Sequence, residues 1–232
     1  MAFSLPSALR GNTTKGSEYL TMLKSKTTLL MHPRHPRHHG VDMQAHHAIS
    51  QKAIFDAKLD ERLEDFGYEI DVANNLVFIP STLQGACLLQ VQPHRGNHTA
   101  EEVKGADDDR QHYPPYHIMV ANRLKAIMPG LEAECGRHGH NIQKTTQDTL
   151  DKISSDIIKK IQRKPREARL TRVYMNFDPG NLRGCGGVDS VTFRGSDTCP
   201  VHRNHTGKHG PDQEAEAITY VFTEQYELKA GN

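Results

Sequence analysis

Histidine is the residue type that most constrains what this chain can fold into and do. The sequence holds 15 histidines among 232 residues, more than a hydrophobic core needs. Neutral imidazole is a general base near physiological pH and a common metal ligand. The positions of the histidines along the chain are therefore the first guide to its fold and function.

Two histidine clusters stand out. His46 and His47 are adjacent, just before a segment with helical spacing of apolar residues, and His94 and His98 lie four residues apart. Positions four apart on a helix share one face, so both imidazoles can reach one ion. A third imidazole, from His46 or His47, would leave one coordination position open for water or substrate. The remaining histidine of the adjacent pair would then be available as a general base.

Composition excludes several classes of protein. Lys and Arg number 29 against 28 Asp and Glu, which excludes a uniformly basic nucleic-acid coat but allows a local basic patch. No apolar run approaches the ~18 residues of a membrane span. Residues 1–11 lack the charged region of a Sec signal peptide. The four cysteines form no CxxC pair, so a disulfide scaffold is not expected. We therefore expect a reduced protein that is made in the cytoplasm.

Apolar periodicity and turn residues give an outline of the secondary structure. The two prolines of the His-Pro-Arg tract, residues 32–39, argue against a regular helix in the N-terminal arm. The remaining expected elements are a helix within 45–66, a turn at Asn74-Asn75, a strand over 76–79 that ends at Pro80, a loop over 81–93, a helix that ends at Pro129, a helix over 141–164, and strands over 188–193 and 218–228.

Three sequence pieces, in this order, resemble the AHH family. They are Ala45-His46-His47-Ala48-Ile49, the stretch from Asp71 to Pro80 with Asn75 at the start of its strand, and Pro93-His94-Arg95-Gly96-Asn97-His98. The AHH family belongs to the HNH/endonuclease VII superfamily of toxin nucleases, which use a ββα-metal finger. The resemblance covers about residues 40–128.

The resemblance implies an α+β fold with an HNH-like ββα-metal nuclease core. Around this core we expect additional helices and a Gly-rich C-terminal extension of strands and loops. The domain organisation predicted from it is a basic, loosely structured arm over residues 1–40, a nuclease core over 41–130, and a helical segment with a C-terminal extension over 131–232.

The resemblance also implies roles for individual residues. His46 would be a metal ligand and His47 the general base that deprotonates the attacking water. Asn75 would hold the loop of the finger through side-chain hydrogen bonds to the backbone. His94 and His98 would complete the metal site, and Arg95 between them would contact the substrate.

One departure from the family pattern leaves an alternative open. In this chain residues 99–111 separate His98 from His112, which stands directly before a Tyr-Pro-Pro-Tyr segment. His112 is therefore an alternative to His98 as the terminal metal ligand. We favour His94 and His98 because their compact spacing fits one metal-binding turn. Imidazole ligands favour Zn²⁺ or Ni²⁺, although a nuclease can use Mg²⁺ with the help of phosphate oxygens.

The C-terminal third holds a second candidate metal set. Two cysteines and neighbouring histidines could hold a structural zinc in a tail with few apolar residues. The alternative is that these residues lie in Gly-rich turns and on the surface. The candidate ligands are Cys185, Cys199, His202 and His205, with His209 close by.

Two basic segments could contact DNA phosphates. One is the His-Pro-Arg tract, for which a solvated linker is the alternative that we favour. The other is the run from Lys159 to Arg172, whose alternative is the polar face of a helix.

The expected function is that of a metal-dependent endonuclease that hydrolyses DNA with little sequence preference. The resemblance implies an antibacterial toxin, delivered by type VI or similar secretion into the cytoplasm of a target cell and countered by a cognate immunity protein. The alternatives are a ribonuclease of the same fold and a non-catalytic zinc-binding interaction module.

Overall fold

The computed structural model describes residues 18–94, 114–170, 218–221 and 224–232. This part of the chain combines helices with one two-stranded antiparallel sheet, so it is of the α+β kind. In chain order the elements are α1 (Glu18–Lys26), the 3-10 turn η2 (Pro36–His39), β1 (Met43–His47), α2 (Gln51–Ala57), α3 (Asp60–Asp65), the 3-10 turn η3 (Ala73–Asn75), β2 (Leu76–Pro80), α4 (Leu83–Leu89), α5 (Pro114–Glu134) and α6 (Ile142–Arg163).

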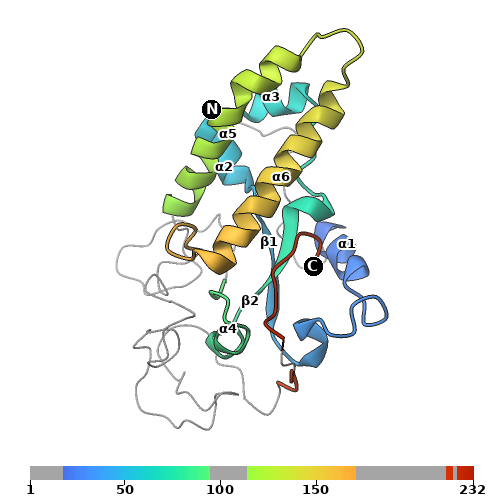
Figure 1. Cartoon of the computed structure of the whole chain (residues 1–232), viewed down its shortest axis with the longest axis vertical. Coiled ribbons are helices and arrows are strands. Elements are labelled where there is room, and N and C mark those ends of the chain that lie inside the picture. Colours follow the sequence, from blue (N-terminus) through green and yellow to red (C-terminus); the bar gives the residue numbers. More distant parts are fainter. Residues whose placement is uncertain (1–17, 95–113, 171–217, 222–223) are drawn as a thin grey trace.

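The sheet lies between two groups of apolar side chains. Strand β2 is buried along its whole length, and β1 pairs with it so that His46 faces Val77 and His47 faces Leu76. Val77 belongs to the large core with α2, α5 and α6, whereas Leu76 belongs to a smaller cluster with α1. Figure 1 shows α1 and α5 on opposite sides of the sheet. Because successive side chains of a strand point to opposite faces, the two histidines enter different environments.

The long helices α5 and α6 supply much of the large core. The stripe predicted over residues 141–164 is confirmed, and Leu150, Ile157 and Ile161 are fully buried. The side chain of Asn141 caps α6 by accepting a hydrogen bond from the backbone of Lys144 at 3.0 Å. Helix α5 does not end at Pro129 as expected. Pro129 has no backbone N–H, so it cannot donate the helical hydrogen bond to the carbonyl of Lys125. Both residues are exposed, so water can bond to this carbonyl instead.

Two further elements differ from the sequence expectation. The histidine pair and Ala45 lie in a strand, and the helix expected within residues 45–66 is two short helices, α2 and α3. Lys58 adopts a left-handed φ of 59° between them, which ends α2. The loop expected over 81–93 contains α4, which Thr82 caps through a 3.2 Å hydrogen bond from the Gly85 amide. Helix α5 runs through residue 130, the predicted end of the nuclease core.

The N-terminal arm is structured from Glu18 onward, which corrects the expected loosely structured arm over this part. Helix α1 buries Leu23 against the sheet, and the His-Pro-Arg tract is folded rather than a solvated linker. His35 is buried, its Nδ1 accepts a hydrogen bond from the Arg37 amide at 3.2 Å, and its ring packs edge-on against Phe78 and Tyr226.

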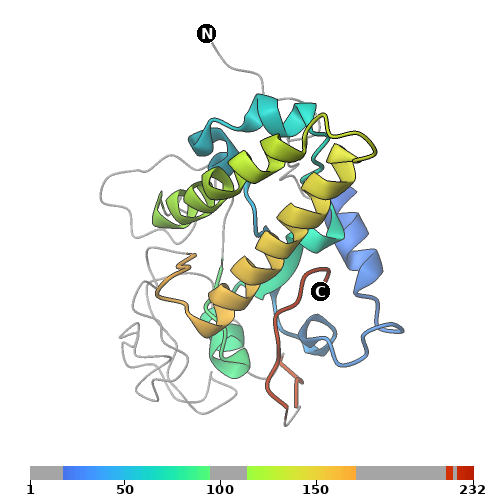
Figure 2. The ribbon, with the colours of Figure 1, turned by 45° about the horizontal axis from the view of Figure 1, so that its top comes forward.

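The C-terminal tail, residues 224–232, runs along the sheet (Figures 1 and 2). The Gly231 amide donates to the Leu76 carbonyl at 2.7 Å, and the Phe78 amide donates to the Asn232 carbonyl at 2.6 Å. The tail therefore covers the edge of β2 that β1 leaves open. The strand predicted over 218–228 does not form within residues 218–221 and 224–228, and the strand predicted over 188–193 lies outside the described residues.

The side chain of Gln162 also holds the tail. Its amide donates to the Tyr226 carbonyl at 2.6 Å and accepts from the Leu228 amide at 2.9 Å. Helix α6 is thus tied directly to the tail. The Gly-rich part of the expected extension, residues 171–217, lies outside the described residues.

Candidate active site

The end of β1 places His46 on the side of the sheet that α5 covers. His46 is 1% exposed, and its Nε2 lies 2.9 Å from the hydroxyl of Tyr116 in the first turns of α5. Its ring centroid lies 4.6 Å from that of His94, at an interplanar angle of 61°. The strand and the segment after α4 therefore bring two predicted metal ligands together.

His94 is fixed by its backbone and by burial. Its amide donates to the Pro80 carbonyl at 2.8 Å, which ties the residue to the end of β2, and its side chain is buried. Burial lowers the pKa of His94 to about 4, so the imidazole is neutral at physiological pH. A neutral imidazole is the form that binds a metal.

The donors present fit a transition-metal ion but do not complete a site. His46 and His94 supply two adjacent imidazoles, and imidazole ligands suit Zn²⁺, Ni²⁺ or a similar ion better than Mg²⁺. Within residues 18–94, 114–170 and the described tail, no group of three or more His, Cys, Asp or Glu side chains could hold a metal. Both candidates for the third ligand, His98 and His112, lie outside the described residues.

His47 lies on the opposite side of the strand, next to α1. Its Nε2 lies 2.7 Å from Oδ1 of Asp71, and its ring packs edge-on against Tyr19 at 4.7 Å. A carboxylate only accepts hydrogen bonds, so Nε2 of His47 carries a hydrogen, and in the neutral imidazole Nδ1 then carries the lone pair. The side chain of His47 is 12% exposed and that of Asp71 is 35% exposed, so the pair is reachable from solvent. The contact with Asp71 thus orients the imidazole of His47.

Asn75 is fully buried between β2 and α6. Its amide donates to the carbonyls of Ile49 and Ile70, both at 3.0 Å. Its Oδ1 accepts from the Ile49 amide and from the Ser154 hydroxyl, both at 2.8 Å. The side chain of Asn75 thus connects three parts of the fold. They are the residues just before α2, the segment before η3, and helix α6. Asn75 acts on the backbone that carries the histidines and touches neither of them in the contacts described.

Sequence reasoning assigned no role to Asp71, Tyr116 or His117. Tyr116 donates its hydroxyl hydrogen to the Ala48 carbonyl at 2.7 Å, and Nδ1 of His117 lies 2.7 Å from the hydroxyl of Ser50, the residue that caps α2. Asp71 and Tyr116 both stand inside the segments compared with the family pattern, but no spacing rule marks them. Only the folded chain shows that each contacts a histidine of the pair.

The basic run is anchored close to His94. Gln92 donates its side-chain amide to the carbonyls of Ile161 and Ala168, both at 2.8 Å, and accepts from the Leu170 amide at 2.9 Å. Several cations of the run form ion pairs. Lys160 and Lys164 pair with Glu167, and Arg163 pairs with Glu227.

The other predicted site residues cannot be placed. Arg95, between the two histidines of the second cluster, lies outside the described residues. The same holds for the candidate zinc ligands Cys185, Cys199, His202 and His205. Their roles stay predictions.

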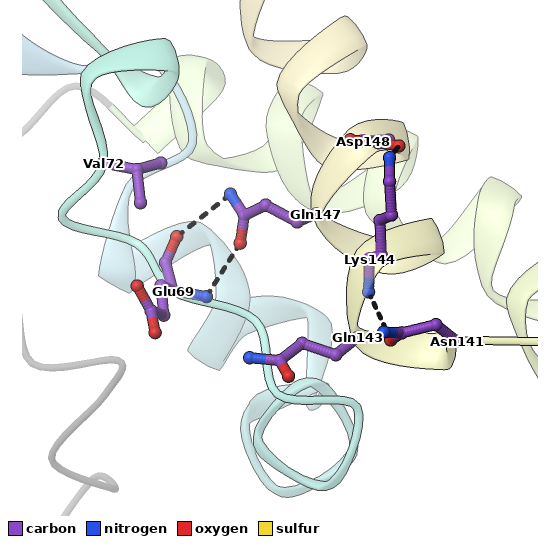
Figure 3. A pocket seen from close by; sticks show the side chains of 7 residues that line it. All are labelled: Glu69, Val72, Asn141, Gln143, Lys144, Gln147 and Asp148. Carbon is purple, nitrogen blue, oxygen red and sulfur yellow. Dashed lines mark hydrogen bonds and ion pairs between the residues drawn. The ribbon is translucent and has the colours of Figure 1, made fainter.

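A pocket of about 380 Å³ that none of these histidines lines lies between the segment before η3 and the first turns of α6 (Figure 3). Gln147 spans it with two hydrogen bonds to the backbone of Glu69, at 3.1 and 3.3 Å. Because this pocket contains no predicted ligand or base, the candidate chemistry is at the end of β1.

Comparison with known proteins identifies a family for this chain. A family model, described as a nuclease family of the HNH/endonuclease VII superfamily with a conserved Ala-His-His, matches residues 27–164, more than half of the chain. No curated protein and no solved structure shows a significant match. None of the described helices is long and apolar enough to cross a membrane. The matched range contains β1, β2, α5 and α6 with every histidine of the candidate site, and the chain therefore belongs to the AHH family of nucleases in the HNH/endonuclease VII superfamily.

Proposed function

We propose that this nuclease is a metal-dependent endonuclease that hydrolyses phosphodiester bonds of DNA with little sequence preference. The proposal rests on the different contacts of the two adjacent histidines at the end of β1. His46 meets a second buried imidazole, His94, on one side of the strand, and His47 meets a carboxylate on the other.

His46 and His94 would hold a divalent ion together with His98, or with His112 in its place. When bound, such an ion stabilises negative charge on the scissile phosphate and on the leaving oxygen. Burial keeps His94 neutral and therefore ready to bind. Asn75 would keep the β1–α2 connection in place while this happens, through its bonds to the Ile49 backbone.

His47 would act as the general base. Its Nδ1 would accept a proton from water as the water oxygen forms a bond to phosphorus and the bond from phosphorus to the leaving oxygen breaks. Asp71 would hold the imidazole in the tautomer that leaves Nδ1 unprotonated, and would stabilise the imidazolium that forms.

The basic run after residue 159 would contact the DNA backbone. Support comes from Gln92, two residues before His94, which holds both the end of α6 and Leu170. Gln92 thus connects the run to the segment that carries His94. Phosphate contacts of this kind are independent of sequence, which agrees with a nuclease of low sequence preference.

A toxin role is proposed on the family resemblance alone. In this proposal the nuclease is made in the cytoplasm, delivered by type VI or similar secretion, and neutralised in its producer by an immunity protein. Expression of the wild-type chain in a test bacterium should stop growth, whereas the His47→Ala variant should not. Growth with the wild-type chain would count against the toxin role.

The test of the activity is cleavage of plasmid DNA and of RNA, each with added divalent metal and with EDTA. We expect metal-dependent cleavage of DNA, lowered about 10²- to 10⁴-fold in His47→Ala. The matched control is His138→Ala, because His138 is an exposed histidine between α5 and α6. Cleavage of RNA alone would point to a ribonuclease, and cleavage by His47→Ala at the wild-type rate would overturn the assignment of the base.

A further inference from the structure

We infer that Tyr116 is a positioning residue that fixes His46 as the Nε2–H tautomer and so makes Nδ1 its metal-binding nitrogen. The part of this inference that concerns the metal rests on the proposed function. The part that concerns the tautomer rests only on the contacts of the folded chain.

The hydrogen bonds of Tyr116 decide the tautomer. A tyrosine hydroxyl has one hydrogen to donate. The oxygen of Tyr116 lies 2.7 Å from the Ala48 carbonyl oxygen and 2.9 Å from Nε2 of His46. The carbonyl cannot donate, so the hydroxyl hydrogen goes to Ala48. The contact with His46 is then a hydrogen bond only if Nε2 carries a hydrogen and donates it.

The two distances agree with this assignment. Values near 2.7 Å are usual for O–H···O bonds and values near 2.9 Å for N–H···O bonds. Both side chains are 1% exposed, so bulk water does not compete for these atoms.

The tautomer determines which nitrogen can bind an ion. A neutral imidazole with hydrogen on Nε2 carries its lone pair on Nδ1. Histidines that bind metals usually donate their other ring N–H to an acceptor, which sets the ring orientation and raises the basicity of the ligating nitrogen. In this chain the acceptor for His46 is a hydroxyl that the Ala48 carbonyl has already engaged.

Tyr116 is itself held by the fold. The next residue, His117, contacts the hydroxyl of Ser50, and Tyr116 contacts the carbonyl of Ala48. Both partners lie in the connection between β1 and α2, and α2 packs against α5. The first turns of α5 are therefore docked next to His46 by contacts that involve no metal.

The test uses the full chain, free of metal and isotopically labelled at histidine, with the tautomer of His46 measured by NMR. We expect Nε2–H in the wild type. In Tyr116→Phe we expect a shift toward a mixture of tautomers, and an affinity for Zn²⁺ alone, measured by chelator competition, that is about 10- to 100-fold lower. The control is Tyr68→Phe. Tyr68 is fully buried, and its hydroxyl has no hydrogen-bond partner in the described part of the chain, so both measurements should stay at wild-type values.

Two results would overturn the inference. One is an Nδ1–H tautomer of His46 in the wild type, a measurement that needs no variant and so does not depend on the folding of Tyr116→Phe. The other is a folded Tyr116→Phe that keeps both the wild-type tautomer and the wild-type Zn²⁺ affinity. If the wild type cleaves no nucleic acid but shows the Nε2–H tautomer and the loss of Zn²⁺ affinity in Tyr116→Phe, the proposed function fails and the positioning role stands.

Discussion

Nε2 of His47 lies 2.7 Å from Oδ1 of Asp71, two residues that are 24 positions apart in the chain. The contact joins the last residue of β1 to the segment before η3, and Asn75 fixes that segment through the Ile70 carbonyl. Asn75 also bonds to the backbone of Ile49, two residues after His47, so one side chain holds the segments of both His47 and Asp71. This relationship gives the first prediction.

Replacement of Asp71 by alanine should lower DNA cleavage by about 10-fold or more, because His47 loses the acceptor that selects its tautomer. The double variant Asp71→Ala/His47→Ala should be no slower than His47→Ala, since the carboxylate acts only through the imidazole. The measurement is the initial rate of plasmid cleavage. Asp148→Ala is the control, because Asp148 pairs with Lys144 on the surface of α6. A further loss of rate in the double variant would show that Asp71 acts independently of His47.

Replacement of His46 or His94 by alanine should each lower Zn²⁺ affinity strongly, because each removes one nitrogen donor. His47→Ala should bind Zn²⁺ like the wild type, since His47 points to the other face of the strand. Isothermal titration of the metal-free chain measures this difference. Equal losses of Zn²⁺ affinity in His47→Ala and His46→Ala would contradict the prediction that only His46 of the pair binds the metal.

Asn75→Ala should destabilise the fold by about 3 kcal/mol or more. Its removal leaves the buried amide of Ile49 and the carbonyls of Ile49 and Ile70 without these partners. Ser154→Ala removes only one of the four bonds and should cost about 1 kcal/mol. Urea unfolding of both variants gives the comparison. A smaller loss in Asn75→Ala than in Ser154→Ala would mean that the amide does not hold this region together.

Stability should fall on mild acidification because of His35. Burial, followed by the positive charges of His38, Arg37 and His32, lowers the pKa of His35 to about 3, whereas an unfolded histidine titrates near 6.5. Between these values the unfolded chain binds more protons than the folded chain, so the free energy of unfolding rises with pH. Above about pH 6.5 this contribution is complete and constant.

The measurement for His35 is the urea midpoint at about pH 5 and about pH 7.5. His35→Asn should reduce the difference between the urea midpoints at the two pH values. Asparagine still offers an acceptor to the Arg37 amide but does not titrate. Carboxylates elsewhere contribute equally to both proteins and cancel in the comparison. An unchanged difference would show that His35 does not control the acid sensitivity.

Sequence reasoning found the parts of the site that depend on residue type at fixed positions. His46, His47, Asn75 and His94 were named from the motif, and the structure brings His46 and His94 together. It could not find Tyr116 or Asp71, because tyrosine and aspartate are common and their contacts with the histidines exist only after β1, α5 and the segment before η3 have packed.

The errors in the fold have a similar cause. Ile49, Ile54 and Ala57 are buried as their periodicity indicated, but periodicity does not show the strand at 43–47 or the left-handed Lys58 that ends α2. The Pro-flanked tract resembled a linker because its neighbours in the fold, Phe78 and Tyr226, are far away in the sequence.

The tail has a consequence for the order in which the chain folds during synthesis. The outer backbone groups of Leu76 and Phe78 obtain partners only when Gly231 and Asn232 have been made. Until then the ribosome-bound chain carries every motif histidine, but the edge of β2 opposite β1 lacks these partners. An unpaired strand edge invites pairing with other chains. The tail can therefore dock on β2 only after residue 232 has been made. We expect a polypeptide cut at residue 164 to leave this edge of β2 open to pairing with other chains.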